Sequence, residues 1–200
     1  MAQDPDTTVH LVCRAREGDE VAFQTLVARN EGRLFLLVRC KGGRALRADC
    51  DVEDLCQEAL LTAWRLLPEF EHRGPGSFFR WLSRVATNAI NDRLRYLDAK
   101  GRNDVRHIES GATSSGGNPR GPLDPNPTAG SLAATREWAT RVFAALRELE
   151  PELGAVVQLH VVEGLSMAEI AAAQRIGKTT VFDRLARGLA GLRDLLGPLD

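Results

Sequence analysis

The sequence predicts an all-α protein made of two small helical domains, an N-terminal helical bundle and a C-terminal helix-turn-helix domain, joined by a flexible linker. Apolar residues recur at helical spacing along most of the chain, and the first half has no alternating pattern long enough for a strand. A stretch rich in proline, glycine and serine separates two helical halves. The 200 residues leave room for two small cores.

The first half is expected to form four helices, each preceded by a residue that favours helix N-caps. The expected caps are, in order, Thr8, Asp19, Asp51 and Ser77. The expected ends are Gly18, the segment near Lys41–Gly43, Pro68 and Ala99. Between the third and fourth helices, Glu69–Gly76 contains two glycines and a proline, which predicts a loop.

The third of these helices, Asp51–Leu67, carries an unusual outer face. Its apolar stripe is expected to be buried. The opposite side combines three carboxylates, an amide and a leucine, from Asp51, Asp54, Gln57, Glu58 and Leu61. A surface that needs only solubility would also carry lysines, so this face favours docking of a basic partner. A solvated acidic face is the alternative.

The composition changes after Ala99. The segment Lys100–Gly130 holds most of the prolines and few large apolar residues. It cannot bury enough surface to offset the entropy of ordering, which predicts a flexible linker between domains at 1–99 and 131–200. A catalytic lid is the minor alternative.

Helical spacing resumes at Ser131, and Pro151 starts a further helix that Gly164 ends. The set expected to be buried in the helix from Ser131 is Leu132, Trp138, Val142, Phe143 and Leu146. Ser166 and Glu169 have the spacing of a capping box. A turn around Gly177 follows, and Thr179 or Thr180 is expected to cap the last helix, so this half has helix-turn-helix architecture. Plain helical bundles also use such pairs. The residues expected to face outward from the last helix are Thr180, Phe182, Asp183, Arg184 and Arg187.

Composition and spacing exclude several classes of function. The formal net charge of −1 argues against a uniformly basic nucleic-acid binder, although local basic patches remain compatible with it. The four cysteines form no CxxC pair, which predicts reduced structural thiols and no metal or redox cofactor. The four histidines are scattered, and no catalytic spacing is visible, which argues against an enzyme. No apolar run approaches a membrane span, and the N-terminus lacks a signal pattern, so a cytosolic protein is expected.

Three segments taken in order resemble the extracytoplasmic-function (ECF) branch of bacterial sigma-70-family sigma factors. They are DVEDLCQEALLTAWRLL, FEHRGPGSFFRWLSRVATNAINDRLR and LRELEPELGAVVQLHVVEGLSMAEIAAAQRIGKTTVFDRLARGLAGLR. The resemblance covers nearly all of the chain except the linker and the termini. It implies a sigma region 2 domain at 1–99 and a sigma region 4 domain at 131–200.

The resemblance also implies a role for each surface. Family members bind core RNA polymerase through the β′ clamp helices and the β flap, trap separated bases of the −10 promoter element, and read the −35 element with the last helix. The implied core-polymerase residues are Asp51, Asp54, Leu55, Gln57, Glu58 and Leu61. The implied −10 residues are Phe70, Arg73, Ser77, Phe78, Arg80, Arg84, Asn88 and Arg95. The implied −35 residues are Lys178, Thr179, Thr180, Phe182, Asp183, Arg184 and Arg187.

Some of these residues have alternative interpretations. Trp81 and at least one phenylalanine are candidates for the core, and Asn88 is alternatively an ordinary surface residue. The loop Glu69–Gly76 is long, so the −10 base preference does not carry over from relatives. Phe182 and Asp183 stand where relatives commonly have a basic residue.

The implied mechanism is DNA binding coupled to strand separation, without bond chemistry. The implied partners are core RNA polymerase, promoter DNA and an anti-sigma factor or other regulator. A helix-turn-helix regulator with an N-terminal sensing domain is the main alternative, but it leaves the acidic helix without a purpose.

Overall fold

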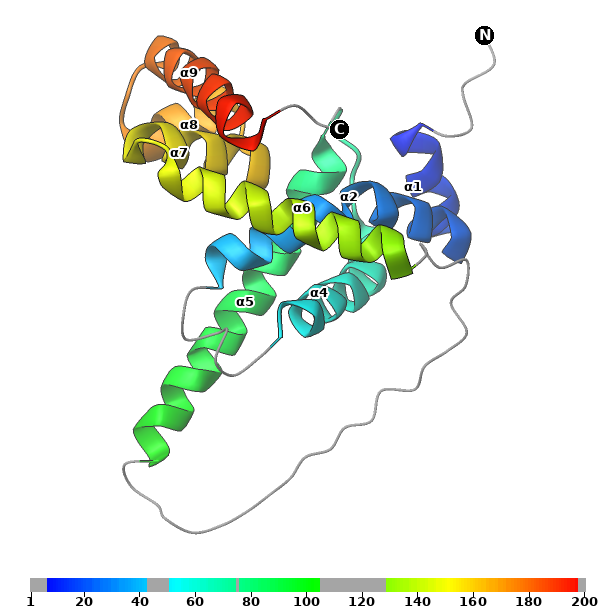
Figure 1. Ribbon diagram of the computed structural model, residues 1–200. Helices are drawn as coiled ribbons and strands as arrows, with labels where there is room; N and C mark the ends of the chain where they lie inside the picture. Colours follow the sequence, from blue (N-terminus) through cyan, green and yellow to red (C-terminus); the bar gives the residue numbers. More distant parts are fainter. Residues whose placement is uncertain (1–6, 43–50, 75, 105–128, 198–200) are drawn as a thin grey trace, which may run out of the picture.

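The computed structural model describes residues 7–42, 51–74, 76–104 and 129–197, and the only regular structure in these ranges is helical (Figure 1). The predicted all-α class is confirmed. In chain order the elements are α1 (Thr8–Arg16), α2 (Glu20–Lys41), α4 (Val52–Leu66), the 3₁₀ turn η1 (Leu67–Glu69), α5 (Ser77–Asp104), α6 (Ala129–Glu148), α7 (Pro151–Val157), the π-helix η2 (Gln158–Val162), α8 (Met167–Gln174) and α9 (Lys178–Leu196).

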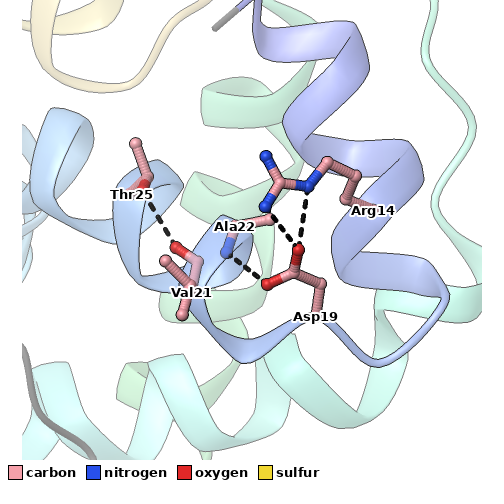
Figure 2. Close-up of polar contacts among 5 residues, drawn as sticks. All are labelled: Arg14, Asp19, Val21, Ala22 and Thr25. Carbon is pink, nitrogen blue, oxygen red and sulfur yellow. Dashed lines mark hydrogen bonds and ion pairs between the residues drawn. The ribbon is translucent and has the colours of Figure 1, made fainter. Parts of the chain in front are cut away.

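The corner between α1 and α2 shows how the sequence sets a helix boundary (Figure 2). The carboxylate of Asp19 accepts a hydrogen bond from the backbone N–H of Ala22 at 3.0 Å, which caps α2 as expected. Its other oxygen lies 2.6 Å from a guanidinium nitrogen of Arg14, which ties α1 to the cap. These two interactions, the backbone bond first, lower the pKa of Asp19.

Two of the other expected caps are also confirmed. The Asp51 side chain accepts from the backbone N–H of Glu53 at the start of α4. Ser166 and Glu169 form a reciprocal capping box at the start of α8, in which the serine hydroxyl accepts from the Glu169 N–H at 3.3 Å and the Glu169 carboxylate accepts from the Ser166 N–H at 2.8 Å.

The caps expected at Thr8, Ser77 and Thr179 or Thr180 were wrong, because each helix begins earlier than the sequence pattern suggested. Helix α1 includes Thr8 and follows an extended Thr7. Helix α9 includes both threonines and follows an extended Gly177. Ser77 is the first residue of α5, and its hydroxyl accepts from the backbone N–H of Arg73 in the preceding loop at 3.2 Å.

Helices α1, α2, α4 and α5 form an N-terminal unit, in which α2 packs against the other three. The C-terminal half of α5 extends beyond the other helices (Figure 1). This helix runs to Asp104, and α6 begins at Ala129, so the two ends of the expected linker, Lys100–Gly130, are helical. The remainder of that linker, residues 105–128, lies outside the described residues.

Helices α6 to α9 form a C-terminal unit. Helix α7 continues into η2, which ends before Gly164 at a φ of +76°, as the glycine predicted. Helices α8 and α9 form the expected helix-turn-helix, with Ile170 and Val181 fully buried in it. Helix α9 approaches α7 closely at Gly188, where an added Cβ would lie 2.5 Å from Val157 Cγ2.

The two units share one continuous cluster of buried apolar side chains. Helix α6 lies across α2 (Figure 1), and the contact centres on Gly32, where an added Cβ would lie 3.2 Å from Thr135 Cγ2. Trp138, expected to be buried, borders this contact and is 39% exposed. Of the rest of that set, Val142 and Leu146 are buried, Phe143 is half-buried, and the Leu132 side chain lies outside the description. The expectation of two separate cores therefore underestimates how closely the two units pack.

Candidate functional site

The acidic face of α4 is present as a surface. Asp51, Asp54, Gln57, Glu58 and Leu61 are all exposed, and Leu61 presents 42% of its surface. Because Asp51 is the N-cap of α4, the positive end of the helix dipole stabilises its carboxylate and those in the first turn. The surface is therefore an aliphatic residue surrounded by acids and an amide, which is suited to a basic partner.

Leu55 is a correction to this set. The sequence resemblance placed it at the polymerase interface, but the side chain is 1% exposed and belongs to the apolar core. Its spacing from Ala59 and Ala63 puts it on the buried stripe of α4, where it packs rather than binds.

At the edge of the acidic face, Glu53 meets the C-terminal unit. A carboxylate oxygen of Glu53 lies 3.3 Å from Arg136 Nε of α6. The side-chain hydrogen bond between Asp51 and Glu53 lowers the pKa of Asp51 and raises the pKa of Glu53. The directions differ because the bond forms when a protonated Glu53 donates to an ionised Asp51. Sequence reasoning missed this contact, because Arg136 lies more than eighty residues further along the chain.

A basic face runs along α5. Arg80, Arg84 and Asn88 follow one another at four-residue intervals, so they share one side of the helix. Arg84 and Asn88 are exposed and Arg80 is half-buried. Further along, Arg95 is exposed and pairs with Asp92 at 2.9 Å. The arrangement places guanidinium groups along a helix with an amide among them, which is suited to phosphates and base edges.

The aromatic residues expected to stack on bases instead build the core. Phe70 and Phe78 are 3% and 2% exposed, and their rings contact each other edge to face with centroids 5.8 Å apart. Trp81 joins both rings, with centroids 5.1 Å from Phe70 and 5.7 Å from Phe78. The expected contact of Phe70 and Phe78 with DNA is therefore wrong for this structure, because no face of either ring is open.

Arg73, in the loop before α5, and Ser77, the first residue of α5, also differ from one another. Ser77 is buried, and its hydroxyl lies 3.2 Å from His72 Nδ1, so it fixes the loop before α5. The Arg73 side chain is 80% exposed and pairs with Glu71 at 2.9 Å. Of the two, only Arg73 is available to a ligand.

The exposed face of α9 carries most of the residues expected there. Lys178, Thr179, Thr180, Phe182, Asp183 and Arg187 are all exposed. Phe182 presents 67% of its surface, so most of its side chain is open to solvent. Arg187 lies 3.5 Å from Glu150 and 3.7 Å from Asp183, and both contacts are at the surface.

Arg184 differs from its neighbours on α9. It forms an ion pair with Glu152 in the first turn of α7, and its side chain is 21% exposed. This contact holds the guanidinium of Arg184 against α7 of the same unit. The sequence could not show it, because the helical spacing alone places Arg184 beside the exposed residues.

Two of the described cysteines are largely buried, and one of the described histidines bonds to the backbone. Burial raises the pKa of Cys40 to about 11 and that of Cys56 to about 12, so both thiols stay protonated. His160 Nδ1 donates to the Leu165 carbonyl at 2.8 Å. No group of histidine, cysteine and acidic residues in the described ranges could hold a metal ion. Cys50 lies outside the described residues.

Comparison with known proteins settles the family. A model described as sigma-70 region 2 matches residues 26–99, and one described as sigma-70, region 4 matches residues 140–192. The chain is 33% identical over 193 residues to the ECF RNA polymerase sigma-E factor of Escherichia coli K12, with 94% of each chain covered. The chain belongs to the ECF RNA polymerase sigma factors.

Other relatives agree with that assignment. The ECF RNA polymerase sigma-E factor of Salmonella typhimurium LT2 is also 33% identical over 193 residues, and that of Haemophilus influenzae is 29% identical over 192 residues. Among solved structures, CnrH in complex with the cytosolic domain of CnrY is similar with a TM-score of 0.47 and 26% identity, covering 96% of this chain and 97% of that one.

The family gives the exposed faces a common context. An ECF sigma factor directs RNA polymerase to promoters and is a non-catalytic initiation factor. The region 2 match covers α4 and the part of α5 that carries the basic face, and the region 4 match covers α7 to the last turn of α9. No helix in the described parts of this ECF sigma factor is long and apolar enough to cross a membrane.

Proposed function

We propose that this ECF sigma factor uses three separate helix faces for three steps of promoter recognition. The acidic face of α4 binds core RNA polymerase, the basic face of α5 engages the −10 element, and the exposed face of α9 engages the −35 element. The observation that carries the proposal is the pairing of an exposed acidic face with an exposed basic face on adjacent helices of one unit. We assign 1–99 and 131–200 to the two functional domains.

For the polymerase step, the acidic face of α4 contacts the β′ clamp helices through Asp54, Gln57 and Glu58. Opposite charges steer and orient this encounter, and Leu61 supplies apolar area at its centre. The β flap is the proposed partner of the C-terminal unit. Since bacterial RNA polymerase works in the cytoplasm, the proposal places this protein there.

For the −10 step, Arg80, Arg84 and Arg95 contact phosphates, and Asn88 binds a base that has left the stack. An amide both donates and accepts, so it recognises a base edge that becomes available only after strand separation. Trapping such a base offsets the few kcal/mol that unstacking costs. The buried Phe70, Phe78 and Ser77 have no proposed contact with DNA and hold the start of α5 in place.

For the −35 step, α9 enters the major groove with Thr179, Asp183 and Arg187 on its outermost side. Phe182 contacts a thymine methyl, and Asp183 accepts from a cytosine amino group. Lys178 and Thr180 contact phosphates at the start of the helix. Arg184 orients α9 against Glu152 and is not itself a base-reading residue.

The proposal also includes a protein regulator of the anti-sigma type, which the resemblance implies. Its presence is tested by identifying the proteins that copurify with the tagged chain from its own cells. A partner that competes with core polymerase for the acidic face of α4 is the expected result.

The decisive experiment separates the two DNA surfaces by the step at which each acts. Arg187→Ala is expected to weaken transcription from duplex promoters by roughly 1–3 kcal/mol, if the contact is to a base edge. A template already mismatched across −10 should not restore its activity. Asn88→Ala should leave duplex −35 binding unchanged and reduce open-complex formation in a manner that depends on the −10 base.

The measurement is permanganate footprinting of both variants with core polymerase, on matched and pre-melted templates selected by runoff transcription. Thr25→Ala is the control, because Thr25 lies on α2 and its hydroxyl donates to the Val21 carbonyl of its own helix. Normal opening by Asn88→Ala at every −10 base would remove Asn88 from the proposed site.

A further inference from the structure

The turn between η2 and α8 lies directly on the start of the basic helix α5. An added Cβ at Gly164 would lie 3.4 Å from Phe79 Cδ1 and 3.6 Å from the Arg80 Cα. We call residues 161–169 the acidic turn, because Glu163 and Glu169 are its charged side chains. It comes from the C-terminal unit, whereas the helix beneath it belongs to the N-terminal unit.

Each glutamate of the acidic turn meets a cation of the N-terminal unit. Glu163 lies 2.9 Å from Lys41 Nζ, and the two side chains are only 14% and 26% exposed. Glu169 lies 3.8 Å from Arg84. A DNA phosphate that binds Arg84 would therefore compete with the Glu169 carboxylate for the same guanidinium.

The amide proposed to receive a base is exposed, but it lines a small cavity together with residues of the same turn. Asn88, Arg84 and Lys41 line one side of a small open cavity of about 190 Å³, and Glu163 and Leu165 line the other. The space beside Asn88 is thus smaller than the roughly 300–1,000 Å³ of ordinary ligand pockets, and Glu163 and Leu165 occupy one border of it. Near it, the Nε of Arg80 is buried without a hydrogen-bond partner, which a phosphate oxygen would provide.

An arginine of the N-terminal unit also caps a helix of the C-terminal unit. Arg33 donates two hydrogen bonds to the Val161 carbonyl, from Nε at 3.1 Å and from Nη2 at 2.7 Å. Carbonyls in the last turn of a helix lack a partner in their own helix, and a cation there also complements the helix dipole. The same guanidinium lies 3.7 Å from the centre of the Phe79 ring, which fixes it over α5.

The contact between α6 and α2 supports the same arrangement. Glycine inside a helix is destabilising relative to alanine, yet α2 has Gly32 where α6 crosses it. The missing side chain lets Thr135 approach within van der Waals distance, and Trp138 covers the edge of the contact. A small residue at this point is explained by the close approach of the two helices.

From these contacts we infer that the C-terminal unit closes over the −10 surface of the free protein, with its acidic turn standing where promoter DNA binds. Closure and −10 binding then exclude each other, and the units separate before Asn88 receives a base. This inference rests on the proposed function of α5. It adds that the C-terminal unit of the same chain occupies the α5 surface when DNA is absent.

A reversible covalent lock tests this inference. The positions Gly32 and Thr135 are close enough for a disulfide, whose Cβ atoms are typically about 3.5–4.5 Å apart. The variant Gly32→Cys/Thr135→Cys is oxidised, and its binding to a labelled pool of random single-stranded 20-mers is measured by anisotropy. The oxidised form should bind at least about fivefold more weakly than the same protein after reduction. Equal affinities in the two states would overturn the inference.

A second variant tests closure without an engineered bond. Glu163→Gln removes the charge from the half-buried ion pair, and the matched control Glu148→Gln removes an exposed charge from the end of α6. Glu163→Gln should increase the radius of gyration measured by small-angle X-ray scattering and tighten binding to the same pool by roughly three- to tenfold. A radius and an affinity equal to those of the control would contradict closure.

The two proposals fail in different ways. Runoff transcription tests the proposed function, and strand binding by the lock tests closure without polymerase or a promoter. A wild-type chain that supports no transcription, together with binding that depends on the lock, would remove the proposed function and keep closure. Normal transcription with binding that ignores the lock would do the reverse.

Discussion

At the scale of single residues, the structure divides residues of similar type into those that hold the fold and those that remain available. Leu55 and Leu61 lie on one helix, but Leu55 is in the core and Leu61 is 42% exposed. Arg184 and Arg187 differ in the same way, because Arg184 is held by Glu152. The available members are the ones whose substitution should affect binding without affecting stability.

The acidic face gives the clearest test at this scale. We expect Asp54→Lys/Glu58→Lys to abolish binding to core polymerase, because like charges facing each other at an interface cost several kcal/mol. The free energy of unfolding should change by less than about 1 kcal/mol, since both residues are exposed. Binding is measured by native gel shift with purified core, and unfolding by circular dichroism.

A matched control makes the same charge change elsewhere. Glu17→Lys/Glu20→Lys alters two exposed acids at the corner between α1 and α2. This control should bind core polymerase normally. If both double variants lost binding equally, net charge would explain the loss and the acidic face of α4 would have no special role.

At the scale of helices, boundaries depend on capping groups that hold specific backbone N–H groups. The capping box at α8 is the most complete case, because Ser166 and Glu169 bond to each other's backbone. The bonds from Ser166 lower the pKa of the Glu169 carboxyl. Glu169 also lies 3.8 Å from Arg84. The position at which α8 begins therefore sets where the Glu169 carboxylate lies relative to α5.

Removal of this cap should have a pH-dependent effect. Ser166→Ala is expected to destabilise the protein by about 1 kcal/mol at pH 7. A carboxyl with a lowered pKa stabilises the fold above its ordinary value of 4.5, and this stabilisation is lost as the pH falls through the lowered value. The difference between wild type and variant should therefore shrink between pH 5 and pH 3, as measured by guanidinium unfolding. A difference that stays constant over this range would argue against Glu169 as the linked group.

Several helix features could be predicted from the sequence, and others could not. Asp19, Asp51 and Ser166 were correctly predicted as caps because their side chains stand directly before an apolar repeat. Thr8 was not, because threonine is also acceptable in a first turn and an extended Thr7 precedes it. The buried state of Phe70 and Phe78 depends on packing across a loop, which local spacing does not show.

At the scale of the whole molecule, the sequence suggested two domains on a tether, but the structure joins them through α2 and α6. This contact depends on the fit of surfaces more than a hundred residues apart, such as Gly32 against Thr135. The acidic, basic and helix-turn-helix surfaces were nevertheless visible in the sequence, because each lies on one helix with a regular repeat. The arrangement of these surfaces relative to one another could not be predicted from the sequence.

The Arg33 cap on Val161 has a consequence for the response to ionic strength. Its acceptor is an uncharged carbonyl and the nearby pair of Lys41 and Glu163 is largely shielded from solvent, so added salt screens closure only slightly. Single-stranded DNA instead loses affinity with a slope of about −0.7 for each phosphate contacted. Scattering and strand binding measured over a salt series should therefore show an unchanged closed form and a steep loss of DNA. High salt should therefore favour the DNA-free closed form.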